Sequence, residues 1–515
     1  MHVGQAAACH HGRGLPIPVA MATPELTLPA SQPPVSTGIA GLDFLLQGGF
    51  TPNRMYLVEG RPGTGKTTIA LQFLIEGRER GEAGLYVALS ETTSELRAVG
   101  ASHGWTLDGI ELFQLPTPHS AAVEEQYTLY HPAEVELGDT IRALLAIVDR
   151  LRPARIVLDS LSELKLLARD PLRFRRQILA LKTYFAGMDT TVLLLDDQTG
   201  GEDSQLQSLC HGVLLLEQLP FEYGRARRRL RIVKFRGVAA TEGFHDFTIS
   251  RGGVAVFPQI EPPGQGEVSL APVESGIAAM DQLVGGGLAW GTTTLFLGPS
   301  GSGKSTLATQ YIAHSREPAS IYLFDERMRT YLHRCDALGM RMSQHIETGR
   351  VKASQIEPGQ LSPGEFSHRV RRDVDEFGAR MILIDSVNGY LHAIPQSDAP
   401  LARMHELLSF LNERGVATIL VLAQHGIVGT MMSTPLDVSY LADTVMMLRF
   451  FEAQGRVRRA ISVVKMRTHV HEATIRELKL GPKRVHIGEA LTDFHGVLTG
   501  VPRYVGGNQG LMHAD

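Results

Sequence analysis

Two stretches of the sequence carry one phosphate-binding pattern: Gly60-Arg61-Pro62-Gly63-Thr64-Gly65-Lys66-Thr67, and again Gly298-Pro299-Ser300-Gly301-Ser302-Gly303-Lys304-Ser305. Each follows an apolar, strand-like run, at 55–58 and 294–297, and precedes a helix-forming run, at 68–74 and 306–312. In that setting the pattern is a P-loop, in which backbone N–H groups and the lysine bind nucleotide phosphates and the hydroxyl residue binds Mg²⁺. The sequence therefore predicts two nucleotide sites.

The two P-loops belong to a longer internal repeat. The run Thr37-Gly38-Ile39-Ala40-Gly41-Leu42-Asp43 recurs as Ser275-Gly276-Ile277-Ala278-Ala279-Met280-Asp281, at the spacing of 238 residues that also separates Lys66 from Lys304. Further along, a spacing of 226 residues separates Asp159 from Asp385. The first copy thus holds about twelve more residues between these landmarks, and we expect them in the polar stretch 117–134, because surface loops tolerate insertions better than strands do.

Length and composition agree with two globular domains. The chain has 515 residues, of which 43% are hydrophobic and 20% charged, with a formal net charge of −4. Residues 1–20 lack the apolar core of a signal peptide, no run of eighteen apolar residues occurs, and the three scattered cysteines indicate a reducing compartment. We expect a cytoplasmic protein that does not enter a membrane. Its expected parts are a disordered segment 1–34, starting at Met1 or Met21, a first domain 35–258, a linker 259–271, a second domain 272–500 and a tail 501–515.

The only dense basic run of the sequence comprises Arg225, Arg227, Arg228 and Arg229. A solvated face of a hairpin is favoured over a site for a polyanion. Because the overall charge is slightly acidic and no longer basic stripe is present, we expect no nucleic-acid partner.

Short apolar runs recur in both halves and predict the strands of a sheet. They lie at 85–89, 156–158 and 191–195, with counterparts at 321–324, 382–384 and 418–422. Near-continuous apolar runs are typical of parallel strands that helices cover on both faces. The predicted fold class is α/β, with two tandem P-loop domains, each a mainly parallel sheet flanked by helices.

Acidic residues end several of these predicted strands. Asp159 and Asp385 each close an apolar run, where they could bind the Mg²⁺ of a bound nucleotide or cap the next helix; recurrence in both halves favours Mg²⁺. Ser90-Glu91 and Asp325-Glu326 follow the neighbouring strand of each half. Their carboxylates could deprotonate the group that attacks the γ-phosphate, or cap a helix, and a base is favoured. The pair of acids predicts a more reactive second site.

Together these residues resemble the KaiC family of RecA-like ATPases from bacteria and archaea, over about 35–502. A K-x-R element makes the resemblance specific: Lys234-Phe235-Arg236 in the first half and Lys465-Met466-Arg467 in the second. Two cations on one face of a strand could also form a surface ion-pair ladder, but their recurrence favours phosphate contact. The resemblance implies that these cations reach the nucleotide of a neighbouring protomer, in a hexameric double ring with ATP at its subunit interfaces.

The resemblance also completes the set of expected site residues. The expected catalytic acids are Glu91, Asp325 and Glu326, and the expected Mg²⁺ ligands are Thr67, Asp159, Ser305 and Asp385. The expected ATP contacts are Gly63, Thr64, Gly65, Lys66, Thr67, Thr68, Lys234, Arg236, Gly301, Ser302, Gly303, Lys304, Ser305, Thr306, Arg459, Lys465 and Arg467.

The chain departs from the family's clock protein at three of the matching positions. Ser90 and Asp325 stand where the family has glutamates, and of a serine–threonine phosphorylation pair only Ser439 is present, followed by Tyr440. Ser439 is therefore the candidate phosphoacceptor, although a serine there could also be a cap or turn residue. The expected function is an ATP-hydrolysing signalling protein with serine/threonine autokinase activity in its second domain. A nucleic-acid motor and a nucleotide-gated scaffold are the alternatives, and the partner is an unidentified protein, for which the resemblance suggests a KaiB-like one.

Overall fold

The computed structural model describes residues 32–114, 132–198, 204–220, 224–260, 269–357, 359–392, 394, 399–424, 439–481, 484–498 and 502–505. Most of the predicted insertion at 117–134 lies outside these residues, as do most of the segment 1–34, the linker and the tail. Within the described part of the chain, no helix is both long and apolar enough to cross a membrane.

The first half forms a nine-stranded sheet in which six parallel strands are followed by three antiparallel ones. In spatial order the strands are β3 (Ile110–Gln114), β2 (Gly84–Ala88), β4 (Arg155–Asp159), β5 (Thr191–Asp197), β1 (Met55–Gly60), β6 (Gly212–Leu219), β7 (Arg227–Phe235), β8 (Phe244–Ser250) and β9 (Gly253–Phe257). The helices are α1 (Ala40–Leu45), α2 (Lys66–Glu79), α3 (Thr93–Ser102), α4 (Pro132–Leu151), α5 (Leu161–Ala168), α6 (Pro171–Ala186) and α7 (Ser204–Leu209).

The second half repeats this sheet with the same order of strands. They are β14 (Val351–Gln355), β13 (Ala319–Leu323), β15 (Met381–Asp385), β16 (Ala417–Ala423), β12 (Thr293–Gly298), β17 (Thr444–Ala453), β18 (Arg456–Met466), β19 (Arg476–Gly481) and β20 (Arg484–Ala490). The helices are α8 (Ala278–Leu283), α9 (Lys304–His314), α10 (Met328–Ala337), α11 (Met342–Glu347), α12 (Pro363–Asp375), α13 (Val387–His392), α14 (Pro400–Glu413) and the 3₁₀ helix η3 (Ser439–Leu441). Two small ribbons complete the fold: β10 (Pro272–Val273) with β11 (Leu288–Ala289), and β21 (Phe494–His495) with β22 (Arg503–Tyr504).

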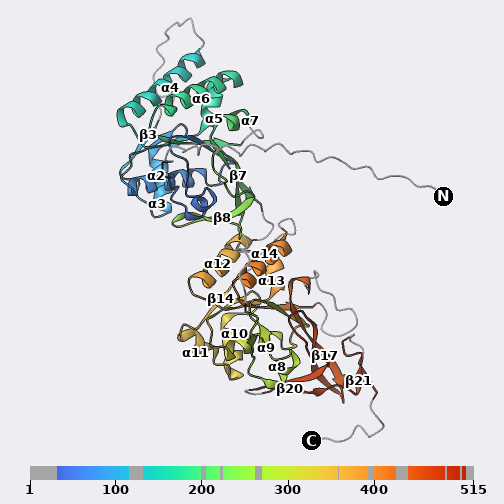
Figure 1. Cartoon of the computed structure of the whole chain (residues 1–515). Helices are drawn as coiled ribbons and strands as arrows, with labels where there is room; N and C mark the ends of the chain where they lie inside the picture. Colours follow the sequence, from blue (N-terminus) through green and yellow to red (C-terminus); the bar gives the residue numbers. More distant parts are fainter. Residues whose placement is uncertain are drawn as a thin grey trace, which may run out of the picture.

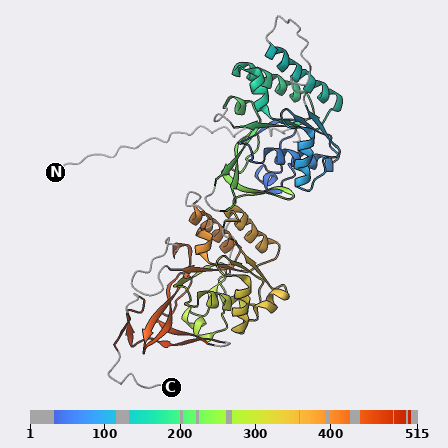
Figure 2. The same ribbon diagram turned by 180° about the vertical axis from the view of Figure 1, so that it is seen from behind.

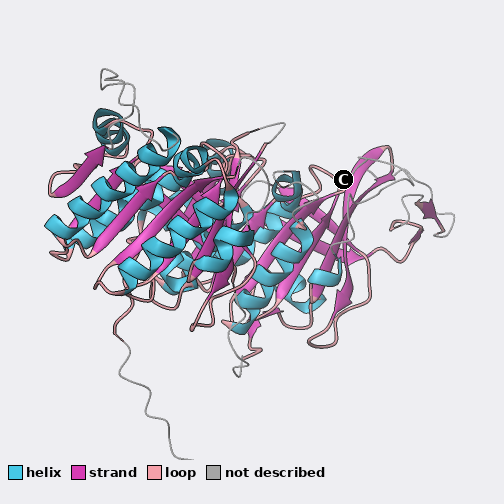
Figure 3. Cartoon of the chain, turned by 90° about the horizontal axis from the view of Figure 1, so that it is seen from above, coloured by secondary structure: helices cyan, strands magenta, loops and turns pink. Residues whose placement is uncertain are grey.

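Helices cover both faces of each sheet, as Figure 3 shows in cyan against magenta strands. The central strand β1 is buried along its whole length, and its alternate side chains enter two different cores: Tyr56 and Val58 one, Met55 and Leu57 the other. Burial on both sides explains why the strands read as continuous apolar runs. The predicted fold class, two tandem α/β domains with mainly parallel sheets, is confirmed.

The two domains meet where α12 and α14 of the second face β8 of the first, as Figures 1 and 2 show from opposite sides. The N–H of Gly364, in the first turn of α12, donates to Asp246 Oδ2 at 2.8 Å. The N–H of Arg225 donates to the carbonyl of Gly359 at 3.1 Å. A carboxylate at the start of a helix is stabilised by the helix dipole, so Asp246 helps to fix the second domain on the first.

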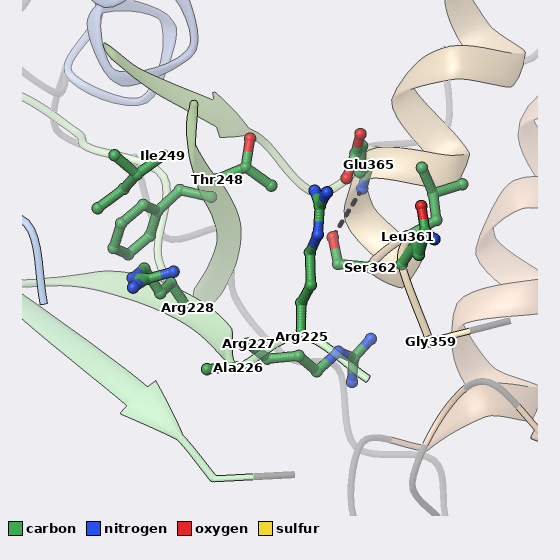
Figure 4. Close-up of a pocket in the computed structure, with 12 residues that line it drawn as sticks. Arg225, Ala226, Arg227, Arg228, Thr248, Ile249, Gly359, Leu361, Ser362 and Glu365 are labelled. Carbon is green, nitrogen blue, oxygen red and sulfur yellow. Dashed lines mark hydrogen bonds between the residues drawn. The ribbon is translucent and has the colours of Figure 1, made fainter. Parts of the chain in front are cut away.

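A cavity of 270 Å³ lies at this junction and is lined by three arginines of the basic run (Figure 4). Arg225, Arg227 and Arg228 line it from the first domain, and the start of α12, with Ser362 and Glu365, lines it from the second. The predicted hairpin is confirmed as β6–β7. Its basic run is solvated only in part, since Arg225 is exposed whereas Arg227 is only 9% exposed. The second domain thus lines one side of a face that the sequence of the first half alone would leave open.

Candidate nucleotide sites

Both P-loops connect a buried strand to a helix in the same way. Gly65 and Gly303 precede α2 and α9, each with a φ of 106°, a left-handed conformation that favours glycine. A Cβ on Gly65 would lie 2.5 Å from Ile249 of β8, and one on Gly303 would lie 3.0 Å from Leu480 of β19. Side chains of the antiparallel strands thus pack against both loops. The N–H groups at the start of each helix point to the place where phosphate would bind.

The hydroxyl and acid predicted to bind Mg²⁺ lie together in each domain. Thr67 Oγ1 donates to Asp159 Oδ2 at 3.3 Å, and the hydroxyl of Tyr86 donates to the same oxygen. In the second domain Ser305 lies beside Asp385, whose Oδ2 is buried without a hydrogen-bond partner among the described residues. Burial raises the pKa of both carboxyls, that of Asp385 to about 6. Buried carboxylates beside a P-loop hydroxyl fit a hard divalent cation.

The two P-loop lysines differ in what their ammonium groups contact. Lys66 Nζ lies 2.7 Å from Asp197 Oδ1 and also donates to the carbonyl oxygens of Gly60 and Arg61, at 2.8 and 3.2 Å. Lys304 Nζ donates to the carbonyl of Pro299 at 2.8 Å, and no acid of the described ranges lies within ion-pair distance. Burial lowers the pKa of Lys304 to about 8, against the opposing effect of Asp385.

The predicted catalytic acids are not equally available. Glu91 of the first site is half-buried, and its Oε2 has no hydrogen-bond partner within the described residues. Burial and the neighbouring charge of Asp159 raise its pKa. In the second site Ser386 donates to Asp325, while Arg334 donates to both carboxylate oxygens of Glu326, at 3.3 and 2.7 Å. The second site has two acids, but both already accept hydrogen bonds, whereas one oxygen of Glu91 has no partner within the described residues. The prediction of a more reactive second site was based on the number of acids alone, and it stays a prediction.

The K-x-R lysines donate hydrogen bonds to backbone carbonyls of short helices in their own domain. Lys234 Nζ donates to three carbonyls near the end of α7, those of Gln207, Ser208 and Cys210, at 2.8 to 3.2 Å. Lys465 Nζ donates to the carbonyl of Ser439, the candidate phosphoacceptor, at 2.8 Å.

The arginines of the expected set also contact groups of their own chain, either backbone carbonyls or a carboxylate. Arg236 donates to the carbonyl of Ser208 at 3.3 Å, and Arg467 lies 3.5 Å from Asp443. Arg459 Nε donates to the carbonyl of Gly301 at 3.3 Å, which places this guanidinium beside the P-loop of its own chain.

The structure adds residues that the sequence did not single out. Asp197, at the end of β5, could have been noticed because an Asp-Asp pair there replaces Leu422-Ala423 of the repeat. The sequence does not mark Arg334 in this way. Its contacts with Glu326 and Thr306 arise because α10 places this side chain beside them in the folded domain. The remaining P-loop residues lie where the motif predicts, with Thr64, Thr68, Ser302 and Thr306 all buried.

Comparison with known proteins identifies the family. The model of the KaiC family of ATPases matches residues 35–261 and again 273–492, which together span most of the chain. The chain belongs to the KaiC family. The resemblance noted from the motifs is thus confirmed.

Several curated KaiC proteins match over nearly their whole length. The circadian clock protein KaiC3 of Synechocystis sp. is 25% identical over 486 residues, covering 91% of this chain and 94% of the relative. The circadian clock oscillator protein KaiC of Parasynechococcus marenigrum is 24% identical over 485 residues, with coverages of 91% and 93%. That of Synechococcus elongatus is 24% identical over 482 residues, with coverages of 90% and 91%. This KaiC-family ATPase therefore has the tandem-domain organisation of the clock proteins, at low identity.

Proposed function

We propose that the chain binds and hydrolyses ATP with Mg²⁺ at both P-loops. The observation that carries the proposal is the pairing of a P-loop hydroxyl with a buried strand-end carboxylate in each domain, Thr67 with Asp159 and Ser305 with Asp385. Mg²⁺ held there would neutralise charge on the terminal phosphates. Lys66 and Lys304 would bind those phosphates, with the N–H groups at the starts of α2 and α9.

The chain's own acids would supply the base. A carboxylate with a raised pKa takes a proton near neutral pH more readily than an ordinary one, which suits Glu91 to the activation of water. In the second site Asp325 and Glu326 would take this role once their present contacts with Ser386 and Arg334 are exchanged.

We further propose that the chain forms a hexameric double ring and phosphorylates Ser439 in its second domain. Membership of the KaiC family and the low-identity clock relatives support an assembly of this kind. Lys465, a proposed contact to the neighbouring protomer's nucleotide, donates to the carbonyl of Ser439. In a ring with that contact, Ser439 would lie close to the neighbour's nucleotide, which favours transfer between protomers over transfer within one.

The test compares wild type with Lys66→Ala and Lys304→Ala. We expect each variant to lose the turnover of one domain, by about 10²-fold, because a lysine that stabilises phosphoryl charge is removed. Phosphate on Ser439, read by mass spectrometry after incubation with ATP and Mg²⁺, is expected in wild type and Lys66→Ala but not in Lys304→Ala. Hydrolysis without phosphate on Ser439 would refute the autokinase alone, and no hydrolysis by any form would favour the nucleotide-gated scaffold.

A further inference from the structure

The ammonium of the first P-loop lysine already has a full set of acceptors. Lys66 Nζ contacts Asp197 Oδ1 at 2.7 Å, Gly60 O at 2.8 Å and Arg61 O at 3.2 Å. An ammonium has three donors, so each is used. The Lys66 side chain is 8% exposed and that of Asp197 is 28% exposed, so the ion pair is partly buried. A phosphate oxygen that binds Lys66 must therefore replace one of these acceptors.

Asp197 is held in this position by the sheet. It is the last residue of β5 and lies opposite Gly60, the last residue of β1. Its own N–H donates to Ser162 Oγ at 3.2 Å, and the N–H of Gln198 donates to the carbonyl of Gly60 at 3.3 Å. With the backbone fixed on both sides of the carboxylate, the side chain is the part that can move when Lys66 takes another partner.

The second domain provides the matched comparison. Ala423 ends β16 opposite Gly298, in the register that Asp197 occupies in the first domain. An alanine cannot pair with Lys304, whose one described acceptor is the carbonyl of Pro299. The glycine before each helix has the same φ, and the residue opposite the last residue of the P-loop strand is an aspartate in the first domain and an alanine in the second.

We propose that Asp197 is an affinity-determining residue of the first nucleotide site: its carboxylate, which pairs with Lys66, competes with the terminal phosphates of ATP for that ammonium group. This inference rests on the proposed binding of ATP at the first P-loop. The competition has two parts: the ion pair must be broken, and the displaced carboxylate stays near the phosphates, where like charges repel. The second site, with Ala423, has neither part, so the first site binds ATP more weakly.

The test measures equilibrium binding of ATP with Mg²⁺ to the full-length protein carrying Lys304→Ala, so that the first site alone is read. Adding Asp197→Ala or Asp197→Asn is expected to lower Kd about tenfold, the effect of removing one competing charge-assisted contact. A matched control is Asp189→Ala, which removes an exposed acid just before β5 and should leave Kd unchanged. The reverse change, Ala423→Asp in a Lys66→Ala chain, is expected to raise Kd of the second site about tenfold.

The outcomes separate this inference from the proposed function. Equal Kd values for Asp197 and both of its replacements would overturn the inference and leave ATP binding in place. A fall in kcat with unchanged KM would also overturn it, because Asp197 would then act in the chemical step. If none of the Lys304→Ala chains binds ATP, with or without Asp197, the proposed function of the first site fails instead. Asp197→Asn, nearly the same in shape as aspartate, guards against loss of folding in Asp197→Ala.

Discussion

The two nucleotide sites of this chain share one backbone frame and differ in the contacts of their charged side chains. In the first, Asp197 pairs with the P-loop lysine, and Oε2 of Glu91, which follows β2, has no hydrogen-bond partner in the part of the chain that the structure describes. In the second, Lys304 has no paired acid in the described residues, and Arg334 holds Glu326. The difference shows that two copies of one P-loop domain can keep the same sheet and loops while the ion pairs and hydrogen bonds of a few charged side chains change.

This contrast assigns different restraints to the two sites. In the first, the lysine that we propose to bind phosphate is paired with an acid, and the candidate base is not. In the second, the corresponding lysine has no paired acid in the described residues, and the candidate bases accept hydrogen bonds. We therefore expect the first site to bind ATP less tightly than the second. We expect the second site to activate water less well than the first.

The largest expected effect is loss of the strand-end carboxylate that both sites share. Asp159→Asn and Asp385→Asn should each reduce the turnover of their own domain about 10²-fold, because asparagine keeps the shape but not the charge for Mg²⁺. Burial disfavours the charged form of both residues, so the same changes should raise the melting temperature of the nucleotide-free protein. Phosphate release and thermal melting measure the two effects, and activity unaffected by either change would exclude this metal site.

The next effect concerns the acids that follow β2 and β13. Glu91→Gln should lower turnover of the first site about 10²-fold, as loss of a general base does. Glu326→Gln should matter less, because Arg334 already holds this carboxylate.

Arg334→Gln tests the second site by removing the arginine that holds Glu326, where the previous changes removed the acids themselves. It releases Glu326, and we expect turnover of the second site to rise several-fold, read in a chain whose first site is silenced by Lys66→Ala. Arg329→Gln, at an arginine of the same helix that has no described contact with Glu326, is the control. A second site that slows when Arg334 is replaced would show that this guanidinium supports the reaction.

A smaller effect tests whether the difference between the sites is local or comes from the junction. Asp246→Ala removes the acceptor for the first turn of α12 and should lower stability by about 1 kcal/mol, as loss of a helix cap does. Gly364→Ala should act similarly, since a Cβ there would lie 2.9 Å from Asp246 Cβ and Oδ2. Neither touches the lysine pairs, so the ATP affinities of the two sites should keep their ratio. If Asp246→Ala changes the ratio of the two ATP affinities, then the junction between the domains determines that ratio.

Sequence reasoning succeeded where an element depends on its own residues or on the repeat. The P-loops, the strands and the acids that end β4 and β15 were predictable because buried parallel strands and phosphate-binding turns impose local patterns. The Asp197–Lys66 pair was not predicted because it joins residues 131 positions apart, through a register that only the folded sheet sets. Arg227 was assigned to a solvated face for a similar reason, since the surface that covers it belongs to the other domain.

The smallest expected effect is a pH response that the first domain has and the second lacks. His245 of β8 is fully buried; its Nδ1 accepts from the N–H of Gln259 at 3.1 Å. Burial lowers its pKa, helped by Arg403 and opposed by the carbonyl of Thr241 and by Asp246.

Because the folded pKa lies below the unfolded value of 6.5, the unfolded chain binds the proton more readily. The stability of β8 should therefore be full above pH 6.5 and fall as the pH drops toward the folded pKa. The counterpart in β19 is Arg476, so the second domain has no histidine at this position. Hydrogen exchange at pH 7 and pH 5.5 should show faster opening of β8 at the lower pH but not of β19. His245→Gln should remove that difference. Equal protection of β8 at both pH values in the wild type would show that His245 has the same pKa in the folded and unfolded states, which contradicts the prediction.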